Sequence, residues 1–471
     1  MSAITFTIDL IYVAAAICFV FGLHLMNSPA TARRGNLLSA AAMAVAIVAT
    51  VVLIANQQHV PAKNWIVMGV CGAAGSVIGL YGARMVKMTA MPQLVSIFNA
   101  VGGGAAALLA IDDILEHRGS GLSNLSSITG ALDIAIGLVT FTGSLIAAGK
   151  LQGWIPGRPL LVYRGSRLVN LALVANAVAT GAWLVADPRG DVAIILLLAA
   201  AAVFGLTMVL PIGGADMPVV ISLLNAFTGT AVAMAGFVID KPVLIIAGAL
   251  VGASGSILTK LMAEAMNRSL ANIMLGGFGT GDAAAPVGAV AGAGNVRTVS
   301  AEDAAIQLGY ASKVILVPGY GLAAAQAQHE LSNLAAYLES HGVDVSFAIH
   351  PVAGRMPGHM NVLLAEADVP YPQLRDMDEI NPEFPLADVA LVVGANDVTN
   401  PAARRPGNAI SGMPILDVDR AKSVIVIKRS LGHGYAGLDN ELYTDPKTAM
   451  FFSDAKAGLA ELLASLKTLV A

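Results

Sequence analysis

Residues 314–324 read Val314-Ile315-Leu316-Val317-Pro318-Gly319-Tyr320-Gly321-Leu322-Ala323-Ala324. An apolar run typical of a buried strand ends in a G-x-G-x-x-A pattern that opens a helical stretch. In dinucleotide-binding folds the first glycine makes a tight turn, the second lets backbone approach the pyrophosphate, and the third small residue keeps helix and sheet close. An ordinary glycine turn has the same pattern. The strand before it and the helix after it favour a nucleotide site formed by Gly319, Tyr320, Gly321 and Ala324.

The rest of the chain after residue 300 alternates between strand-like and helical patterns. Strand-like runs lie at 313–317, 343–349, 389–393 and 424–428, and helical stretches lie near 322–340, 358–367 and 448–469. Strands separated by helices predict a parallel, doubly wound sheet. We therefore expect a Rossmann-like α/β domain over 301–471, preceded by a Gly- and Ala-rich linker at 271–300.

The ends of two other strands bear on which nucleotide binds. The second strand ends in His350, where NAD enzymes usually carry an acidic residue for the ribose hydroxyls. Lys428, Arg429 and Ser430 follow a later strand and offer two cations and a hydroxyl to a 2′-phosphate, although a solvated strand end would look the same. Together these features favour NADP over NAD. Arg355 could clamp the pyrophosphate or simply stabilise its own loop.

The first 270 residues have a different composition. The chain of 471 residues is 56% hydrophobic and 12% charged, with a mean hydropathy of +0.72, whereas soluble domains carry about 25% charged residues. Residues 1–270 hold only 24 of the charges, and the remaining 201 residues hold 34. Apolar segments long enough to cross a bilayer lie at 3–26, 36–56, 64–85, 93–111, 124–148, 167–186, 191–210, 217–238 and 242–263. Residues 1–270 are thus predicted to form an α-helical polytopic membrane domain of nine transmembrane helices.

The placement of charged residues predicts the membrane topology and excludes one class of function. Asp9 stands where a signal peptide would be basic, so the first segment is interpreted as a retained helix. The loops that follow the first, third, fifth, seventh and ninth apolar segments carry ten Lys and Arg residues, whereas the N-terminus and the other loops carry four. This asymmetry predicts an external N-terminus and a cytoplasmic C-terminal domain. A net charge of −4 without a basic run excludes a nucleic-acid binder. Cys18 and Cys71, both in apolar stretches, indicate neither a disulfide framework nor a zinc site.

An internal repeat joins two of the apolar segments. Met91-Pro92-Gln93-Leu94-Val95-Ser96-Ile97-Phe98-Asn99-Ala100 returns as Met217-Pro218-Val219-Val220-Ile221-Ser222-Leu223-Leu224-Asn225-Ala226, at an offset of 126 residues. The same offset aligns Gly103 with Gly229. This predicts a parallel structural repeat about an axis along the membrane normal; shared low-complexity composition is the alternative.

Polar residues inside apolar segments are candidates for a proton path. Asn99, Asp133 and Asn225 lie within predicted helices, and Asp216 precedes the second Met-Pro pair. Helix–helix hydrogen bonding is the structural alternative for the amides, and a helix N-cap is the alternative for Asp216. No catalytic nucleophile with a base, metal cluster or haem ligand pair is recognisable. Hydride transfer between two nicotinamides needs only oriented rings and excluded water.

Distinctive motifs run along nearly the whole chain: Gly213-Gly214-Ala215-Asp216-Met217-Pro218, Ala265-Met266-Asn267-Arg268-Ser269, Pro318-Gly319-Tyr320-Gly321, His350-Pro351-Val352-Ala353-Gly354-Arg355, Met377-Asp378-Glu379-Ile380-Asn381, Gly394-Ala395-Asn396-Asp397 and Gly434-Tyr435-Ala436-Gly437. With these motifs, a nine-helix membrane part followed by a nucleotide-binding domain resembles the beta subunit of the proton-translocating NAD(P) transhydrogenase.

The resemblance implies functions for individual residues. NADP(H) would bind this chain, reversed relative to the usual dinucleotide direction. Arg355 would belong to a cofactor-binding loop, Asp397 to a loop that responds to protonation, and Asp216 and Asn225 to proton transfer or coupling. The implied cofactor contacts are Gly319, Tyr320, Gly321, Ala324, Val352, Ala353, Gly354, Arg355, Gly394, Asn396, Asp397, the 2′-phosphate residues Lys428, Arg429 and Ser430, and the lid residues Gly434, Tyr435 and Ala436.

One position departs from the family pattern. Many members have a proton-carrying His where this chain has Asn99, and an amide does not titrate. Either a His of the partner chain substitutes or the proton route differs. The resemblance further implies an NAD(H)-binding alpha subunit as partner, a dimer of alpha–beta units, and a bacterial inner membrane. A secondary transporter whose cytosolic domain senses NADP(H) remains the alternative function.

Overall fold

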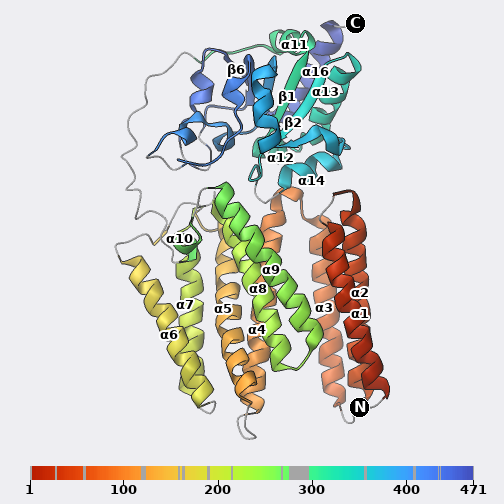
Figure 1. Cartoon of the computed structure of the whole chain (residues 1–471), viewed down its shortest axis with the longest axis vertical. Coiled ribbons are helices and arrows are strands. Elements are labelled where there is room, and N and C mark those ends of the chain that lie inside the picture. Colours follow the sequence, from red (N-terminus) through yellow and green to blue (C-terminus); the bar gives the residue numbers. More distant parts are fainter. Residues whose placement is uncertain are drawn as a thin grey trace.

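The computed structural model describes residues 3–26, 29–56, 60–117, 123–156, 160–161, 165–187, 191–213, 216–266, 269–274, 296–354, 358–406, 410–432, 434, 436 and 438–469. Long helices form a bundle, and a sheet domain lies at one end of it (Figure 1). The N-terminal end of the chain lies at the end of the bundle away from the sheet domain (Figure 1).

Within the described residues, nine helices are long and apolar enough to cross a membrane. They are α1 (Ala3–Met26), α2 (Pro29–Asn56), α3 (Ala62–Met85), α4 (Met91–Glu116), α5 (Asn124–Gln152), α6 (Ser166–Ala186), α7 (Asp191–Val209), α8 (Met217–Val238) and α9 (Pro242–Ala265). A short 3₁₀ helix, η1 (Met88–Ala90), precedes α4, and α10 (Leu270–Met274) follows α9. The largest differences from the predicted segments are at α2 and α4, because these helices continue into polar sequence where the apolar pattern ends.

The sequence repeat reappears in the packing. The Ser96 hydroxyl of α4 donates to the Ser144 carbonyl of α5 at 2.8 Å, and the equivalent Ser222 of α8 donates to the Gly255 carbonyl of α9 at 3.3 Å. The equivalent glycines Gly103 and Gly229 each lie where a side chain would strike the next helix. The α4–α5 and α8–α9 pairs therefore use the same kinds of contact, a serine-to-carbonyl hydrogen bond and a close glycine approach, which favours a true repeat over shared composition.

The sheet domain is a six-stranded parallel sheet in the order β3-β2-β1-β4-β5-β6. Its strands are β1 (Lys313–Pro318), β2 (Asp344–Ile349), β3 (Leu374–Asp376), β4 (Val389–Val393), β5 (Ser423–Lys428) and β6 (Thr448–Phe452). Four of these lie where the sequence predicted strands. Residues 296–300 run beside β6, with a bridge from Thr298 to Met450.

Two helix predictions in this domain were wrong in part. The predicted helix at 448–469 begins as β6, and α16 occupies only Ala455–Leu469. The predicted helix at 322–340 is two helices, α12 (Tyr320–Ala325) and α13 (Gln328–Ser340), because Gln326 adopts a left-handed conformation with φ of +52°. The helix predicted near 358–367 is α14 (His359–Glu366).

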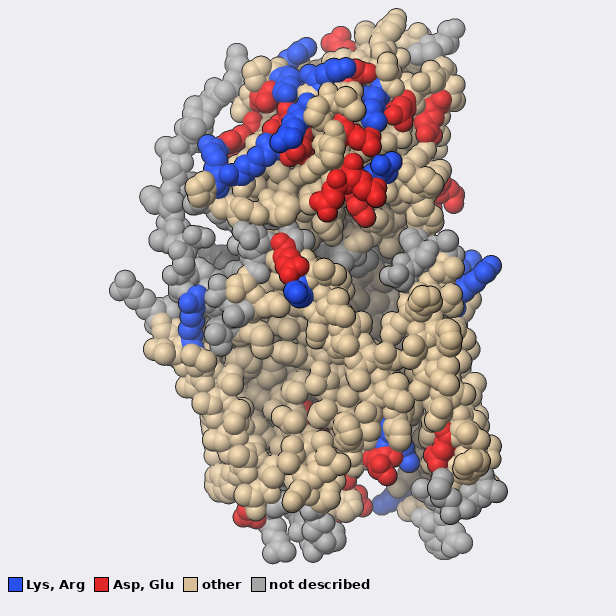
Figure 2. All heavy atoms as spheres, in the orientation of Figure 1, with Lys and Arg blue, Asp and Glu red and all other residues tan. Residues whose placement is uncertain are grey.

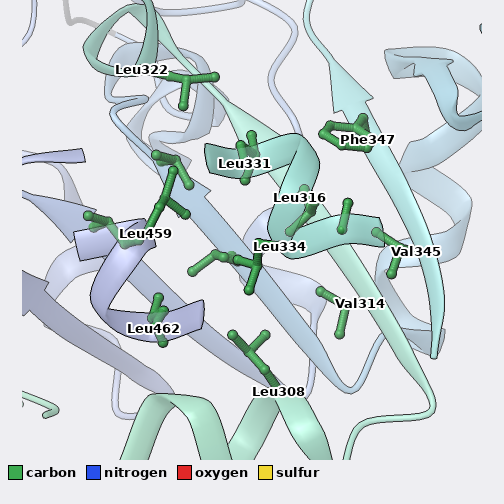
Figure 3. Close-up of a cluster of buried hydrophobic side chains, with 14 of the residues drawn as sticks. Leu308, Val314, Leu316, Leu322, Leu331, Leu334, Val345, Phe347, Leu459 and Leu462 are labelled. Carbon is green, nitrogen blue, oxygen red and sulfur yellow. The ribbon is translucent and has the colours of Figure 1, made fainter. Parts of the chain in front are cut away.

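Both faces of the sheet are covered. One face packs against α11 (Ala301–Gly309), α12, α13, α14 and α16, in a cluster of buried side chains that includes Leu316, Leu334, Phe347 and Leu459 (Figure 3). The other face packs against 3₁₀ helices and loops through Phe384 and neighbouring residues. Charged side chains crowd the sheet domain and are sparse over the helices (Figure 2), as the sequence composition predicted.

A glycine-to-alanine pair tests the bundle packing. A methyl group on Gly137 of α5 would lie 2.5 Å from the Gly103 carbonyl oxygen of α4, so the backbones must separate. We expect Gly137→Ala to destabilise the bundle by about 1–3 kcal/mol and to lower the thermal unfolding midpoint in detergent. Gly75→Ala is the control, because nothing lies within 4 Å of its added methyl group. Equal midpoints for the two variants would contradict the packing described here.

Candidate functional site

The carboxyl ends of β1, β2, β4 and β5 meet at one edge of the sheet. Pro318 pairs with Val393, and Val393 pairs with Ile427. The turns that follow these strands therefore lie side by side, although they are up to about 110 residues apart in the chain. The structure thus brings the predicted glycine turn, His350, Gly394 and Lys428 to the same edge.

The turn after β1 packs directly on the turn after β4. Gly319 N–H donates to the Val393 carbonyl at 2.9 Å, and Gly321 N–H donates to the Gly394 carbonyl at 2.8 Å. A methyl group on Gly321 would lie 2.6 Å from Cα of Gly394, which itself has φ of +68°. Tyr320 is the first residue of α12. The glycines therefore let two backbones touch, a constraint that the fingerprint pattern alone did not reveal.

The residue that packs closely between α12 and the sheet lies one position before the one that the G-x-G-x-x-A pattern predicts. Ala324 is exposed, whereas Leu322 and Ala323 are buried. The close helix–sheet packing expected of Ala324 is made by Ala323, because α12 is short and turns its buried face one residue earlier.

A polar network ties the loop after β4 to the loop after β5. The Asp397 carboxylate accepts from Ala436 N–H at 3.0 Å. With its amide oxygen facing Lys428, Asn396 accepts from that ammonium at 3.0 Å and from Gly434 N–H at 2.6 Å. These contacts connect Asn396 and Asp397 with two of the predicted lid residues. Tyr435, the third, lies outside the described residues.

Lys428 and Arg429 have different surroundings. The Lys428 ammonium lies 3.3 Å from the Tyr443 hydroxyl and 4.7 Å from the centre of its ring. Burial lowers the pKa of Lys428, and the Asp397 carboxylate opposes that shift. Arg429 and Ser430 are exposed, and Arg429 makes no hydrogen bond or ion pair with any residue that the structure describes. Arg429 is therefore the freer cation for an anionic ligand.

His350 is a structural histidine at the end of β2. Its Nε2 donates to the Pro414 carbonyl at 2.8 Å, and its Nδ1 accepts from Val352 N–H at 3.2 Å. Burial lowers the pKa of His350 to about 4, so the ring is neutral. The strand end thus carries no carboxylate, as the sequence indicated. Beyond it, Ala353 is buried and Gly354 has φ of +104°; Arg355 lies outside the described residues.

Sequence reasoning missed the buried residues that hold these loops together. Tyr443 donates from its hydroxyl to the Ala395 carbonyl at 3.1 Å. The Asn440 amide donates to the Asn396 carbonyl at 3.0 Å, and the Asn400 amide donates to the Asp439 carbonyl at 2.9 Å. No local pattern marks them, because their partners are about 40 residues away.

In the bundle, Asn99 and Asn225 lie on neighbouring helices. Asn99 is buried, and its amide donates to the Ile221 carbonyl of α8 at 3.3 Å. Ile221 is one helical turn before Asn225, which is partly exposed. Asn99 and Asn225, which the repeat makes equivalent, therefore both lie near the hydrogen bond that joins α4 to α8.

Asp216 is buried before α8 and makes no side-chain N-cap hydrogen bond. The N-cap alternative is thus not the geometry of this structure. Lys150, which the sequence analysis used only for topology, is buried at the end of α5 and donates to the Leu210 and Ile212 carbonyls at 2.5 and 2.7 Å. It anchors the connection that leads to Asp216.

Comparison with known proteins gives a consistent family. A family model described as NAD(P) transhydrogenase beta subunit matches residues 8–465. Two relatives named NAD(P) transhydrogenase subunit beta, one from Rhodospirillum rubrum and one from a designated strain of that species, are each 46% identical to this chain. Each alignment covers 94% of this chain and 96% of the relative.

The neutral His350 predicts a pH dependence of the sheet's stability. Its folded pKa, about 4, lies below the unfolded value of 6.5. Its stabilising contribution is therefore present above about pH 6.5 and is lost as the pH falls toward 4, by up to about 3 kcal/mol. Hydrogen exchange of β2 amides in the full chain, corrected for intrinsic rates, should show weaker protection at pH 5 than at pH 7. His350→Gln should remove this dependence, whereas exposed His341→Gln should keep it. A pH dependence unchanged in His350→Gln would contradict the assignment.

Proposed function

The chain belongs to the NAD(P) transhydrogenase beta-subunit family, and from this membership we propose which part of it performs each step of the reaction. It is the membrane subunit of an oxidoreductase that couples hydride transfer between NAD(H) and NADP(H) to proton translocation, and it works with an alpha subunit. The family match favours this function over a secondary transporter that only senses the nucleotide.

NADP(H) binds at the sheet edge over 301–471. The strand order is that of a Rossmann-like doubly wound sheet, in which ligands bind where the order reverses, here between β1 and β4. The observation that carries this assignment is the position of exposed Arg429 and Ser430 at the same edge as the Gly319–Gly321 turn. The buried, neutral His350 in place of a carboxylate supports NADP(H) over NAD(H).

The chain's own residues bind and orient the nucleotide. Arg429 and Ser430 fit a 2′-phosphate, and Lys428 positions the loop through Tyr443. Asp397 holds the Gly434–Ala436 lid through Ala436 N–H. Arg355 and Tyr435 complete the loop and the lid by family resemblance. Bound NADP(H) supplies a nicotinamide that exchanges hydride with NAD(H) on the alpha subunit, so this edge must face that partner and exclude water.

Residues 1–270 conduct the proton, and 271–300 link the two parts. Asp216, Asn99 and Asn225 lie in the part of the bundle nearer the sheet domain and contribute to coupling. The excess of Lys and Arg in alternate loops supports a periplasmic N-terminus and a cytoplasmic C-terminal domain in a bacterial inner membrane. Two alpha–beta units form the complete assembly.

The phosphate assignment predicts a change in nucleotide preference. Arg429→Ala should weaken NADPH binding to the full chain about 10- to 150-fold and leave NADH binding nearly unchanged, because a charge-assisted bond to the phosphate contributes about 1.5–3 kcal/mol. Titration calorimetry with both nucleotides measures this. Arg420→Ala is the control, because Arg420 pairs with Asp417 just before β5, at the opposite edge. Equal affinity of the unaltered chain for NADPH and NADH would contradict NADP(H) binding here.

Replacing Asp216 should separate proton coupling from NADPH binding. Asp216→Asn keeps shape but removes the titratable group, so NADPH-driven reduction of an NAD analogue in vesicles containing the alpha subunit should fall at least tenfold. NADPH affinity should stay unchanged. Asp240→Asn, in the exposed turn at the other end of α8, should retain full activity. Near-normal proton uptake in Asp216→Asn would indicate a structural function instead.

A further inference from the structure

Asp133 is a carboxylic acid enclosed within the bundle. Its side chain is 0% exposed, and neither Oδ1 nor Oδ2 has a hydrogen-bond partner among the described residues. It lies nine residues after the start of α5, about 13 Å along the helix axis. A buried polar group without a partner is rare and calls for an explanation.

The residues one turn away place Asp133 against α4 and α8. A methyl group on Gly130 would lie 3.2 Å from Ile114 of α4 and 4.0 Å from Val238 of α8. A methyl group on Gly137 would lie 3.0 Å from Cβ of Ala107. Asp133 shares this helix face at spacings of three and four residues. The face of α5 that carries Asp133 therefore packs against α4 and α8.

Among the described residues, no basic group forms a hydrogen bond with the Asp133 carboxyl. α8 contains no charged residue between Met217 and Val238. The described charged groups on the parts of α4, α6 and α7 nearest Asp133 are near the helix ends: Asp112, Asp113, Glu116, Asp187 and Asp191, with His117 paired to Asp113. The basic group of α6, Arg167, is at the helix's other end. An ionised carboxylate is costly in such surroundings, so Asp133 holds a proton until water or a moving dipole reaches it.

Buried polar side chains lie on both sides of Asp133 along one face of α5. Thr140 and Ser144 lie toward Asn99, and Thr129 lies in the opposite direction. Ser144 accepts from Ser96 through its backbone, and Asn99 is one turn beyond Ser96 on α4. We name Thr129, Asp133, Thr140 and Ser144 of α5, together with Gln93 of α4, the α4–α5 polar seam.

The seam contains further groups without a protein partner. Gln93 Oε1 and Ser144 Oγ are buried and lack hydrogen-bond partners in the described part of the chain. Such groups are normally satisfied by protein or by ordered water. Three residues with this property in one helix interface indicate that water completes their hydrogen bonding.

We propose that Asp133 accepts and releases the translocated proton inside the membrane, and that the α4–α5 polar seam connects it to Asn99. The proposal rests on the coupling function proposed above. A proton that arrives through water from one side of the membrane adds to a carboxylate oxygen of Asp133. On release, the O–H bond breaks and the proton passes to water in the α4–α5 polar seam. Asn99 and the hydroxyls orient that water but do not hold the proton.

The test uses the complete complex with its alpha subunit in sealed vesicles. Asp133→Asn should lower the initial rates of NADPH-driven NAD-analogue reduction and of proton uptake at least tenfold, with NADPH affinity unchanged. Asp133→Glu should retain part of both rates with a displaced pH profile. Asp112→Asn, an exposed acid on α4, should behave as the unaltered complex. Proton uptake within twofold of the unaltered complex in Asp133→Asn would overturn the proposal.

A second measurement separates proton binding from folding. Infrared difference spectra of the complex between low and high pH should contain the C=O stretching band of a buried carboxylic acid, shifted in Asp133→Glu and missing in any Asp133→Asn that folds. No change of this band in Asp133→Glu would also overturn the assignment. If the unaltered complex reduced the NAD analogue without any proton uptake, the coupling function itself would fail, which is a different result.

Discussion

Polar groups inside the nine long helices must find partners within the protein, because a membrane interior offers none. The packing of α4, α5 and α8 follows from this constraint. Serine hydroxyls reach carbonyls of the next helix, Asn99 reaches the α8 backbone, and Lys150 reaches two carbonyls of the α7–α8 connection. Glycine and alanine at the contacts bring the backbones close enough for these bonds. The few polar groups that remain without a protein partner are then the ones that mark function.

The sheet domain obeys a different constraint, the contact of two backbone turns. Gly319 and Gly321 meet Gly394 and Ala395 with no space for a side chain. This contact fixes the turn after β1 relative to the loop after β4, and the Asn396–Asn440–Tyr443 network fixes that loop relative to the one after β5. The start of the loop after β5, with the partly buried ammonium of Lys428, is consequently held beside the glycine turn.

Patterns local in sequence were predictable, and contacts distant in sequence were not. The long helices and four strands follow from apolar runs, and the equivalence of Asn99 and Asn225 follows from the repeat. The short edge strands β3 and β6 were missed because three to five residues give too weak a pattern. The functions of Asn440 and Tyr443 depend on partners about 40 residues away. The burial of Ala323 instead of Ala324 depends on how far the short helix α12 rotates, which no fingerprint specifies. The inward direction of Asp133 likewise required the packing of α4 and α8 around it.

The two constraints meet where α12 reaches the bundle. This helix begins in the glycine turn and is only six residues long, about 9 Å. It contacts η1, the short helix that leads directly into α4. A cavity of about 280 Å³ lies at this junction, lined from the bundle by Lys87 and Thr89 and from the sheet domain by Gln326 and Gln328. Because α4 carries Asn99 and one side of the polar seam, α12 and η1 connect the turn after β1 to the helix that borders Asp133. Both ends of this connection are closely packed, through the turns at Gly321 and Gly394 on one side and the contact of Gly103 of α4 with α5 on the other, so α12 and η1 join two rigid parts of the chain.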